Sequence, residues 1–278
     1  MDLKLQIGHA TDTGMRRDHN EDCLGVSRSK NGEPDPRGTI LVVADGMGGY
    51  AAGEVASNLT VTTIIDSYFG FSAGGVADGL SAALKKANQV VVEAATEDTE
   101  RAGMGATAAV ALVLDSELFV ANVGDSRVYL IHDGELQQIS HDHSWVAELV
   151  AVGKITPEEA KVHPMRNVIT RSIGGRPQVE IETYPPQPLV HGDVILLCSD
   201  GLWGMVPGEQ IRRIIESLPP QPAADALIAA ANQAGGHDNI TAIVCRILGS
   251  PEDTEDDATE QVDLLEVQNT EPMPQLQL

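Results

Sequence analysis

The residues most suited to chemistry are acidic side chains at the ends of apolar, strand-like segments, each beside glycine or asparagine. Asp45 follows the apolar run 40–44, and Asp200 follows the run 194–199. Carboxylates at strand ends can converge at one edge of a sandwich, where they repel one another unless cations neutralise them. The members of this set are Glu21, Asp45, Asp125, Asp200 and Asp238.

A cluster of this kind would suit Mg²⁺ or Mn²⁺, because both ions prefer hard oxygen ligands. Any one of these aspartates could instead serve only as a turn former, since Asp-Gly is common turn chemistry. The five acidic residues together favour a metal site over five independent turns.

Two divalent cations about 3.5–4 Å apart can activate a water molecule and hold a phosphoryl oxygen. A phosphate ester that approaches an acidic site also needs a cation to receive its negative charge. Arg17 stands four residues before Glu21, and its planar guanidinium suits phosphoryl oxygens. The alternative is that Arg17 is a surface arginine in a charged loop.

The segment around Asp45 predicts the element on which the site depends. The run 40–44 contains five apolar residues, which predicts a buried strand. Gly46, Gly48 and Gly49 follow Asp45, where the backbone must bend sharply or allow a close approach. The sequence therefore predicts a strand that delivers a carboxylate into a glycine-rich turn.

Periodicity predicts the remaining elements. The predicted strands are 3–8, 23–28, 38–44, 106–114, 118–123, 127–132, 135–139, 179–183, 193–199 and 240–247. The predicted helices are 53–69, 76–96, 208–217 and 222–234. This order predicts an α+β fold, a four-layer α-β-β-α sandwich of two antiparallel sheets flanked by helix pairs.

Two segments depart from this pattern. Residues 144–177 are polar, and we interpret them as an inserted surface module. Within them Thr156, Pro157 and Glu159 predict a helix start with a capping box. Residues 249–278 contain nine acidic residues and no Lys or Arg, which predicts a disordered tail.

The overall composition argues against several classes of protein. A formal net charge of −23 argues against general binding to nucleic acid or to an anionic membrane. The three cysteines, Cys23, Cys198 and Cys245, lack the C-x-x-C spacing of a zinc site and indicate no disulfide framework. No apolar run approaches the roughly 20 residues that cross a bilayer. We therefore expect a cytoplasmic protein that does not enter membranes.

Six motifs stand in order between about residues 5 and 247. They are Arg17-Asp18-His19-Asn20-Glu21-Asp22, Asp45-Gly46-Met47-Gly48-Gly49, Gly124-Asp125-Ser126-Arg127, His141-Asp142-His143-Ser144, Ser199-Asp200-Gly201-Leu202-Trp203 and Asp238-Asn239-Ile240-Thr241. Together they resemble the PP2C (PPM) family of metal-dependent protein serine/threonine phosphatases, in its bacterial form. One such motif would be weak evidence, but six in register are specific.

The resemblance implies a phosphatase domain over residues 1–248, in which 144–177 form a flap beside the active site. It implies that Asp45 is catalytic and bridges two Mn²⁺ or Mg²⁺ ions, and that the carbonyl group of Gly46 ligates one of them. The other ligands that it implies are Asp200 and Asp238 for the first metal, Glu21 for the second, and Asp125 with Asp200 for a third.

The resemblance also implies a reaction. Arg17 would bind the substrate phosphate and contribute to catalysis, while Asp22 and Asn239 would support the ligands through hydrogen bonds. A hydroxide that bridges the metals would attack phosphorus directly, without a phosphoenzyme. The substrates would be phosphoserine and phosphothreonine in proteins, the targets of a serine/threonine kinase, and we expect the enzyme to be a monomer.

The sequence departs from the family where a general acid could stand. Met47 occupies the position at which animal members carry histidine, and Tyr50 occupies the position at which some bacterial relatives carry one. We expect the proton of the leaving group to come from metal-bound water. His19 is an alternative donor, but a lone histidine in a loop is more often structural or exposed to solvent, so no histidine is assigned this role.

Two other functions fit parts of the pattern. A pseudophosphatase that binds phosphoproteins or scaffolds a signalling complex should have lost Asp45, Asp200 or Asp238, and all three are present. A phosphoesterase for small molecules would share the same chemistry. The long polar flap weakly favours a protein substrate, and rates on phosphopeptides and metabolite phosphates would distinguish the two.

Overall fold

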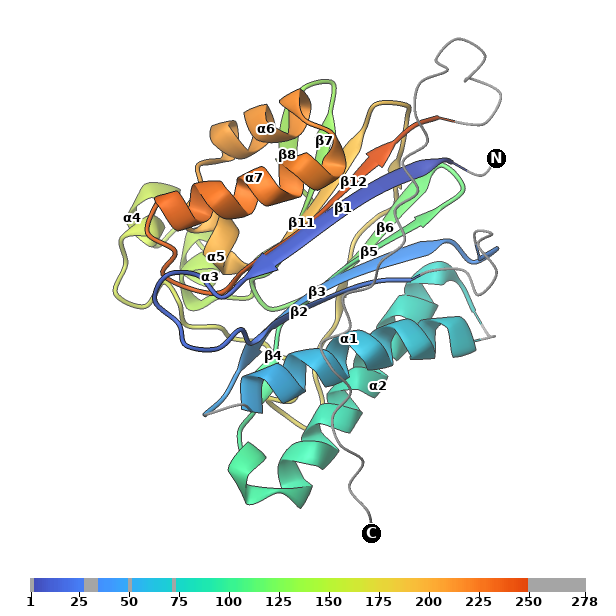
Figure 1. Ribbon diagram of the computed structural model, residues 1–278. Coiled ribbons are helices and arrows are strands. Elements are labelled where there is room, and N and C mark those ends of the chain that lie inside the picture. Colours follow the sequence, from blue (N-terminus) through green and yellow to red (C-terminus); the bar gives the residue numbers. More distant parts are fainter. Residues whose placement is uncertain (1–2, 28–34, 50–51, 72–73, 250–278) are drawn as a thin grey trace.

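The computed structural model describes residues 3–27, 35–49, 52–71 and 74–249. In these residues two antiparallel sheets lie face to face, with helices outside each sheet (Figure 1). The predicted disordered tail lies outside the described residues except for Gly249, and so does Tyr50.

The first sheet has seven strands, of which five form the path β10-β6-β5-β3-β2. On this path lie β2 (Asp22–Val26), β3 (Thr39–Met47), β5 (Ala108–Leu114), β6 (Glu117–Val123) and β10 (Gln187–Pro188). Two further strands pair beside it: β4 (Gly105–Ala106) with β3, and β9 (Glu182–Thr183) with β6.

The second sheet has five strands in the order β1-β12-β11-β7-β8. Its members are β1 (Leu5–Asp12), β7 (Arg127–His132), β8 (Glu135–Gln138), β11 (Val194–Cys198) and β12 (Ile240–Ile247). The turn between β6 and β7 therefore carries the chain from one sheet to the other.

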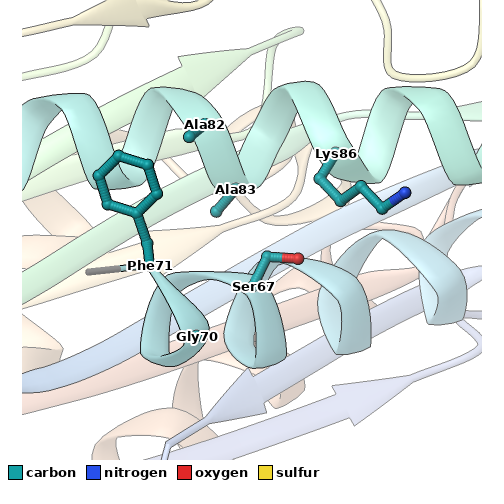
Figure 2. A pocket seen from close by; sticks show the side chains of 6 residues that line it. All are labelled: Ser67, Gly70, Phe71, Ala82, Ala83 and Lys86. Carbon is teal, nitrogen blue, oxygen red and sulfur yellow. The ribbon is translucent and has the colours of Figure 1, made fainter. Parts of the chain in front are cut away.

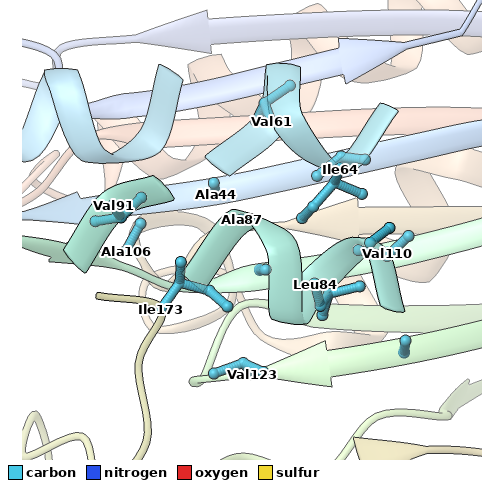
Figure 3. Packing of buried hydrophobic residues seen from close by; sticks show 14 of the residues in the cluster. Ala44, Val61, Ile64, Leu84, Ala87, Val91, Ala106, Val110, Val123 and Ile173 are labelled. Atoms are coloured by element: carbon cyan, nitrogen blue, oxygen red, sulfur yellow. The ribbon is translucent and has the colours of Figure 1, made fainter. Parts of the chain in front are cut away.

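A helix pair covers the outer face of each sheet. The pair α1 (Ala52–Gly70) and α2 (Val76–Glu97) packs on the first sheet, as Figure 3 shows for Ile64 and Leu84 against Val110. The pair α6 (Gly208–Ser217) and α7 (Pro220–Gln233) packs on the second sheet. A third apolar cluster fills the space between the two sheets. The predicted four-layer sandwich is confirmed.

The burial of β3 explains how the strand-end residues come to face one another. Ile40, Val42 and Ala44 pack against the helix pair, whereas Leu41 and Val43 pack between the sheets. Because side chains alternate along a strand, the next residue, Asp45, is also directed between the sheets. The continuous apolar run is thus typical of a strand that is buried on both faces.

Several element boundaries differ from the predictions. β1 extends to Asp12, beyond the predicted end at residue 8, because it pairs with β12 along its whole length. The hydroxyl groups of Thr11 and Thr241 lie 2.7 Å apart across this pair, so polar residues continue the strand. The short helix α5 (Asp200–Trp203) and the strand β10 were not predicted.

The segment 144–177 contains two short helices, α3 (Trp145–Ala151) and α4 (Pro157–Lys161), and then returns to the core. The predicted capping box is confirmed: the hydroxyl group of Thr156 accepts from Glu159 N at 3.2 Å, and Thr156 N donates to Glu159 Oε2 at 2.8 Å. Ile173, however, is fully buried against the first sheet and its helices. The end of the segment therefore belongs to the core.

Among the residues that the structure describes, no helix combines the length and the apolar character that a bilayer crossing requires.

Candidate metal centre

The strand-end carboxylates gather at one end of the sandwich, and both sheets contribute to them. Asp22 and Asp45 are paired directly across β2 and β3 of the first sheet. Asp200 begins α5 immediately after β11 of the second sheet, and Asp238 precedes β12. Asp125 lies in the turn from β6 to β7, between the two sheets.

Two glycines allow the backbone to approach closely at this site. A Cβ atom on Gly46 would lie 2.1 Å from the carbonyl oxygen of Gly53, and one on Gly201 would lie 2.0 Å from that of Asn239. Gly46 N donates to the carbonyl oxygen of Glu21 at 3.1 Å. Both positions require glycine because of this close approach.

The acidic side chains perturb one another strongly. Burial, followed by the charges of Asp22, Asp200, Asp125 and Asp238, raises the pKa of Asp45 well above its usual value. Burial and then Asp200 raise the pKa of Asp125 to about 8. Burial is also the main cause that raises the pKa of Asp22 to about 7 and that of Asp200 to about 6. Such a cluster holds protons at neutral pH unless cations replace them.

Four carboxylate oxygens of the site are buried and have no hydrogen-bond partner. They are Glu21 Oε1, Asp22 Oδ1, Asp125 Oδ1 and Asp200 Oδ1. An unpaired buried carboxylate oxygen is costly, and oxygen donors are the ligands that Mg²⁺ and Mn²⁺ prefer. The residues present therefore fit a site for divalent cations.

The predicted ligands are not all arranged around one point. In the part of the chain that the structure describes, no three Asp, Glu, His or Cys side chains have the spacing that would enclose a metal ion. Asp238 is turned toward Arg17, and its Oδ2 atom lies 2.8 Å from Arg17 Nη2. Because 48% of the Arg17 side chain is exposed, its guanidinium is also accessible to a ligand in solution.

Asn239 holds the loop that carries Arg17 and Glu21. Its Oδ1 atom accepts from Glu21 N at 2.8 Å, and its Nδ2 atom donates to the carbonyl oxygens of His19 and Thr13 at 2.8 and 3.0 Å. Asn239 is buried. The side chain thus uses its acceptor and both donors to fix the backbone before β2.

Hydroxyl groups that sequence reasoning did not single out connect the acidic segments. Ser199 Oγ donates to Asp22 Oδ2 at 2.7 Å and accepts from Thr241 N at 3.0 Å, which joins the two sheets. Thr107 Oγ1 accepts from Asp45 N at 2.8 Å and lies 2.6 Å from Ser126 Oγ. Ser199 and Ser126 lie in the motifs, whereas Thr107 belongs to none of them.

Two histidines of the motifs and the flap, His143 and His163, form hydrogen bonds through their ring nitrogens. His143 is buried, its Nδ1 atom accepts from Gly124 N at 3.1 Å, and its Nε2 atom contacts Glu182 Oε2 at 2.7 Å. Burial lowers the pKa of His143. Its ring nitrogens are therefore both engaged in holding the structure. His163 is half-buried, and its Nδ1 atom accepts from Met165 N at 3.1 Å.

A shallow groove between α1 and α2 is a separate feature (Figure 2). Its lining residues are Ser67, Gly70, Phe71, Ala82, Ala83 and Lys86. Ser67 lies 14 residues after Gly53, or about 21 Å along α1 from the end that adjoins the acidic cluster. Among the described residues that line it, none carries a carboxylate group, and the groove is not part of the candidate metal centre.

The sequence as a whole was compared with known proteins. The family model described as "Protein phosphatase 2C" matches residues 8–148. The serine/threonine phosphatase Stp of Listeria monocytogenes is 39% identical over 239 residues, which are 84% of this chain and 92% of that protein. The chain belongs to the protein phosphatase 2C family. By homology it is a protein serine/threonine phosphatase, as the six motifs predicted.

Solved structures of this family agree with the fold. Stp1 from Staphylococcus aureus is 36% identical, with a TM-score of 0.80 over 90% of this chain and 96% of that chain. The catalytic domain of the protein phosphatase PstP, in complex with two manganese ions, is 35% identical, with a TM-score of 0.77 over 89% of this chain and all of that chain. Full-length PstP of Mycobacterium tuberculosis is longer, and the match covers 46% of it.

Proposed function

We propose that this protein hydrolyses phosphoserine and phosphothreonine in other proteins with the help of two Mn²⁺ or Mg²⁺ ions. The observation that carries the proposal is the set of four buried carboxylate oxygens without partners at the junction of the two sheets. Family membership supports it, since a relative's catalytic domain binds two manganese ions.

The proposed ligands are those that the motifs supply. Asp45 would ligate both metals, and the carbonyl group of Gly46 would ligate one of them. The other proposed ligands are Asp200 and Asp238 for one metal, Glu21 for the second, and Asp125 with Asp200 for a third. When bound, the metals would supply an activated water molecule and positive charge opposite the phosphoryl oxygens.

The chain's own groups would orient the substrate and the ligands. Arg17 would bind the phosphate, because its guanidinium is accessible and lies beside the acidic cluster. In the structure it contacts Asp238, so the phosphate and Asp238 would share this cation. Asp22 and Asn239 would hold the backbone and the neighbouring side chains, as their contacts with Ser199 and Glu21 indicate.

We further propose that residues 1–248 form the phosphatase domain, with 144–177 as its flap and 249–278 as a tail outside that domain. The substrates would be proteins that a serine/threonine kinase has phosphorylated, and the enzyme would act as a monomer. A variant that ends at residue 248 should retain hydrolysis of a phosphothreonine peptide.

The decisive experiment measures Mn²⁺-dependent release of phosphate from a phosphothreonine peptide. Asp45→Ala and Asp238→Ala should abolish hydrolysis while the circular dichroism spectrum stays unchanged. Asp66→Ala changes an exposed aspartate on α1 and serves as the matched control. Full activity in excess EDTA would contradict the proposal. Binding of the peptide without turnover at saturating Mn²⁺ would indicate a pseudophosphatase instead.

A further inference from the structure

The turn that carries Asp125 is held by an aromatic side chain that is not a candidate ligand. Trp203 Nε1 donates to the carbonyl oxygen of Asp125 at 2.9 Å. The guanidinium carbon of Arg127 lies 3.4 Å from the centre of the Trp203 ring. Trp203 therefore contacts both the backbone of Asp125 and the side chain two residues later.

Arg127 is itself fixed in one orientation. Its Nε and Nη2 atoms donate to the two carboxylate oxygens of Asp142 at 2.9 and 2.6 Å, and its Nη1 atom donates to Tyr129 Oη at 2.8 Å. Gln138 Nε2 donates to Asp142 Oδ1 at 3.0 Å. Because the pairing is bidentate and planar, the face of the guanidinium is available to stack on the indole ring.

The same contacts join the two segments that carry Asp125 and Asp200. Asp200 is the first residue of α5 and Trp203 is the last, so the indole connects this helix to the β6–β7 turn. Asp125 Oδ1 and Asp200 Oδ1 are both buried without a hydrogen-bond partner, and two carboxylates at such a site repel each other. Contacts elsewhere must hold the two segments together against this repulsion.

The peptide before Asp125 has a separate anchor. Gly124 N donates to His143 Nδ1 at 3.1 Å, and His143 N donates to the carbonyl oxygen of Gly124 at 2.9 Å. Loss of the indole N–H group would therefore release the carbonyl group of Asp125 without releasing the whole turn.

We propose that Trp203 and Arg127 are positioning residues that set the placement of Asp125 relative to Asp200. They would thereby set the affinity of the third divalent cation that these two carboxylates would share. The inference rests on the proposed function, because that cation is part of it. Asp200 would also ligate one of the two other metals, but the indole N–H group holds Asp125 and not Asp200. Because Glu21, Asp45 and Asp238 lie outside the contact, these two metals would depend much less on it.

The test is calorimetric titration of Mn²⁺ into the metal-free, full-length protein. Trp203→Phe keeps an aromatic ring beside Arg127 but removes the N–H donor. We expect the weakest Mn²⁺ site to lose about tenfold in affinity, the effect of one buried acceptor left unpaired. The tighter sites should change less than about twofold. Trp145→Phe is the matched control, because Trp145 is the chain's other tryptophan and is 45% exposed on α3.

A second variant tests the stacking of the Arg127 guanidinium on the Trp203 ring. Arg127→Lys keeps the positive charge beside Asp142 but loses the planar, bidentate geometry. Arg127→Lys should also weaken Mn²⁺ binding at the third site. The double variant with Trp203→Phe should lose less binding free energy at this site than the sum of the two single losses, because both changes act through one contact.

The outcomes separate the inference from the proposed function. Three Mn²⁺ sites of which only the weakest responds to Trp203→Phe would support the inference. The inference would be overturned if Trp203→Phe weakened all sites equally, if it weakened none, or if the wild-type protein bound only two Mn²⁺ ions. In each of these cases, Mn²⁺-dependent hydrolysis by the wild-type protein would still support the proposed function. A wild-type protein that binds no Mn²⁺ would overturn both.

Discussion

Replacement of Asp125 with asparagine should stabilise the metal-free protein. Asp125 is only 3% exposed, and its Oδ1 atom has no hydrogen-bond partner. The charges of Asp200 and Asp142 add to the effect of burial and raise its pKa from 3.8 to about 8. An asparagine side chain at this position would have nearly the same shape without a charge, so the folded state would no longer have to accommodate or neutralise one.

The size of the effect follows from the pKa. Between the ordinary value of 3.8 and pH 7, each pH unit contributes about 1.4 kcal/mol, which gives an upper limit of about 4 kcal/mol. The buried amide of asparagine also needs partners, so we expect a net gain of about 2 kcal/mol at pH 7. In a domain of this size that gain corresponds to a rise in Tm of about 4–8 °C.

The assay is thermal unfolding in EDTA at pH 7 and pH 5, with Asp66→Asn as an exposed control on α1. The gain from Asp125→Asn should shrink by more than half at pH 5, because there the unfolded carboxyl is closer to its own pKa. Added Mn²⁺ should raise the Tm of the wild-type protein more than that of the variant. A lower Tm for the variant at pH 7 in EDTA would refute the reasoning.

Three further predictions concern the rest of the site. The pKa values of Asp22 and Asp200 are raised in the folded state from 3.8 to about 7 and about 6, so their contribution to stability is lost as pH rises from about 4 to about 7. Urea unfolding in EDTA should show that the free energy of unfolding falls as the pH rises, and added Mn²⁺ should reverse this fall. A free energy of unfolding that rises with pH would contradict the prediction. Asn239→Ala removes three hydrogen bonds and should lower the free energy of unfolding by about 2–3 kcal/mol. Amide hydrogen exchange in residues 13–21 should become faster, and unchanged exchange would argue against the anchoring role of Asn239. Arg17→Ala should raise KM for a phosphopeptide about tenfold, as expected for one charge-assisted contact; an unchanged KM would exclude phosphate binding by Arg17.

Local patterns in the sequence were sufficient to predict most of the helices and strands of the fold. The apolar run before Asp45 predicted β3, and helical spacing predicted α1 and α2 with ends close to those observed. The Thr156 capping box was also correct. Such features depend on neighbouring residues, whose spacing the sequence displays directly.

Contacts between distant residues could not be predicted in the same way. Arg17 and Asp238 form an ion pair although 221 positions separate them, and nothing in their local spacing indicates it. Thr107 supports Asp45 from its position between β4 and β5 and belongs to no motif. Ile173 is buried although it lies in a polar segment, because its environment is set by the first sheet and its helices and not by its sequence neighbours.

The position of the acidic cluster across the two sheets has a consequence for mutations far from it. Ser199, directly after β11 of the second sheet, donates to Asp22 of the first sheet. The apolar cluster between the sheets sets their spacing. A substitution such as Leu41→Ala would allow the sheets to shift relative to each other. Metal affinity should then change although no ligand has been altered. Measured across a series of such core variants, metal affinity would report how accurately the two halves of the molecule are aligned.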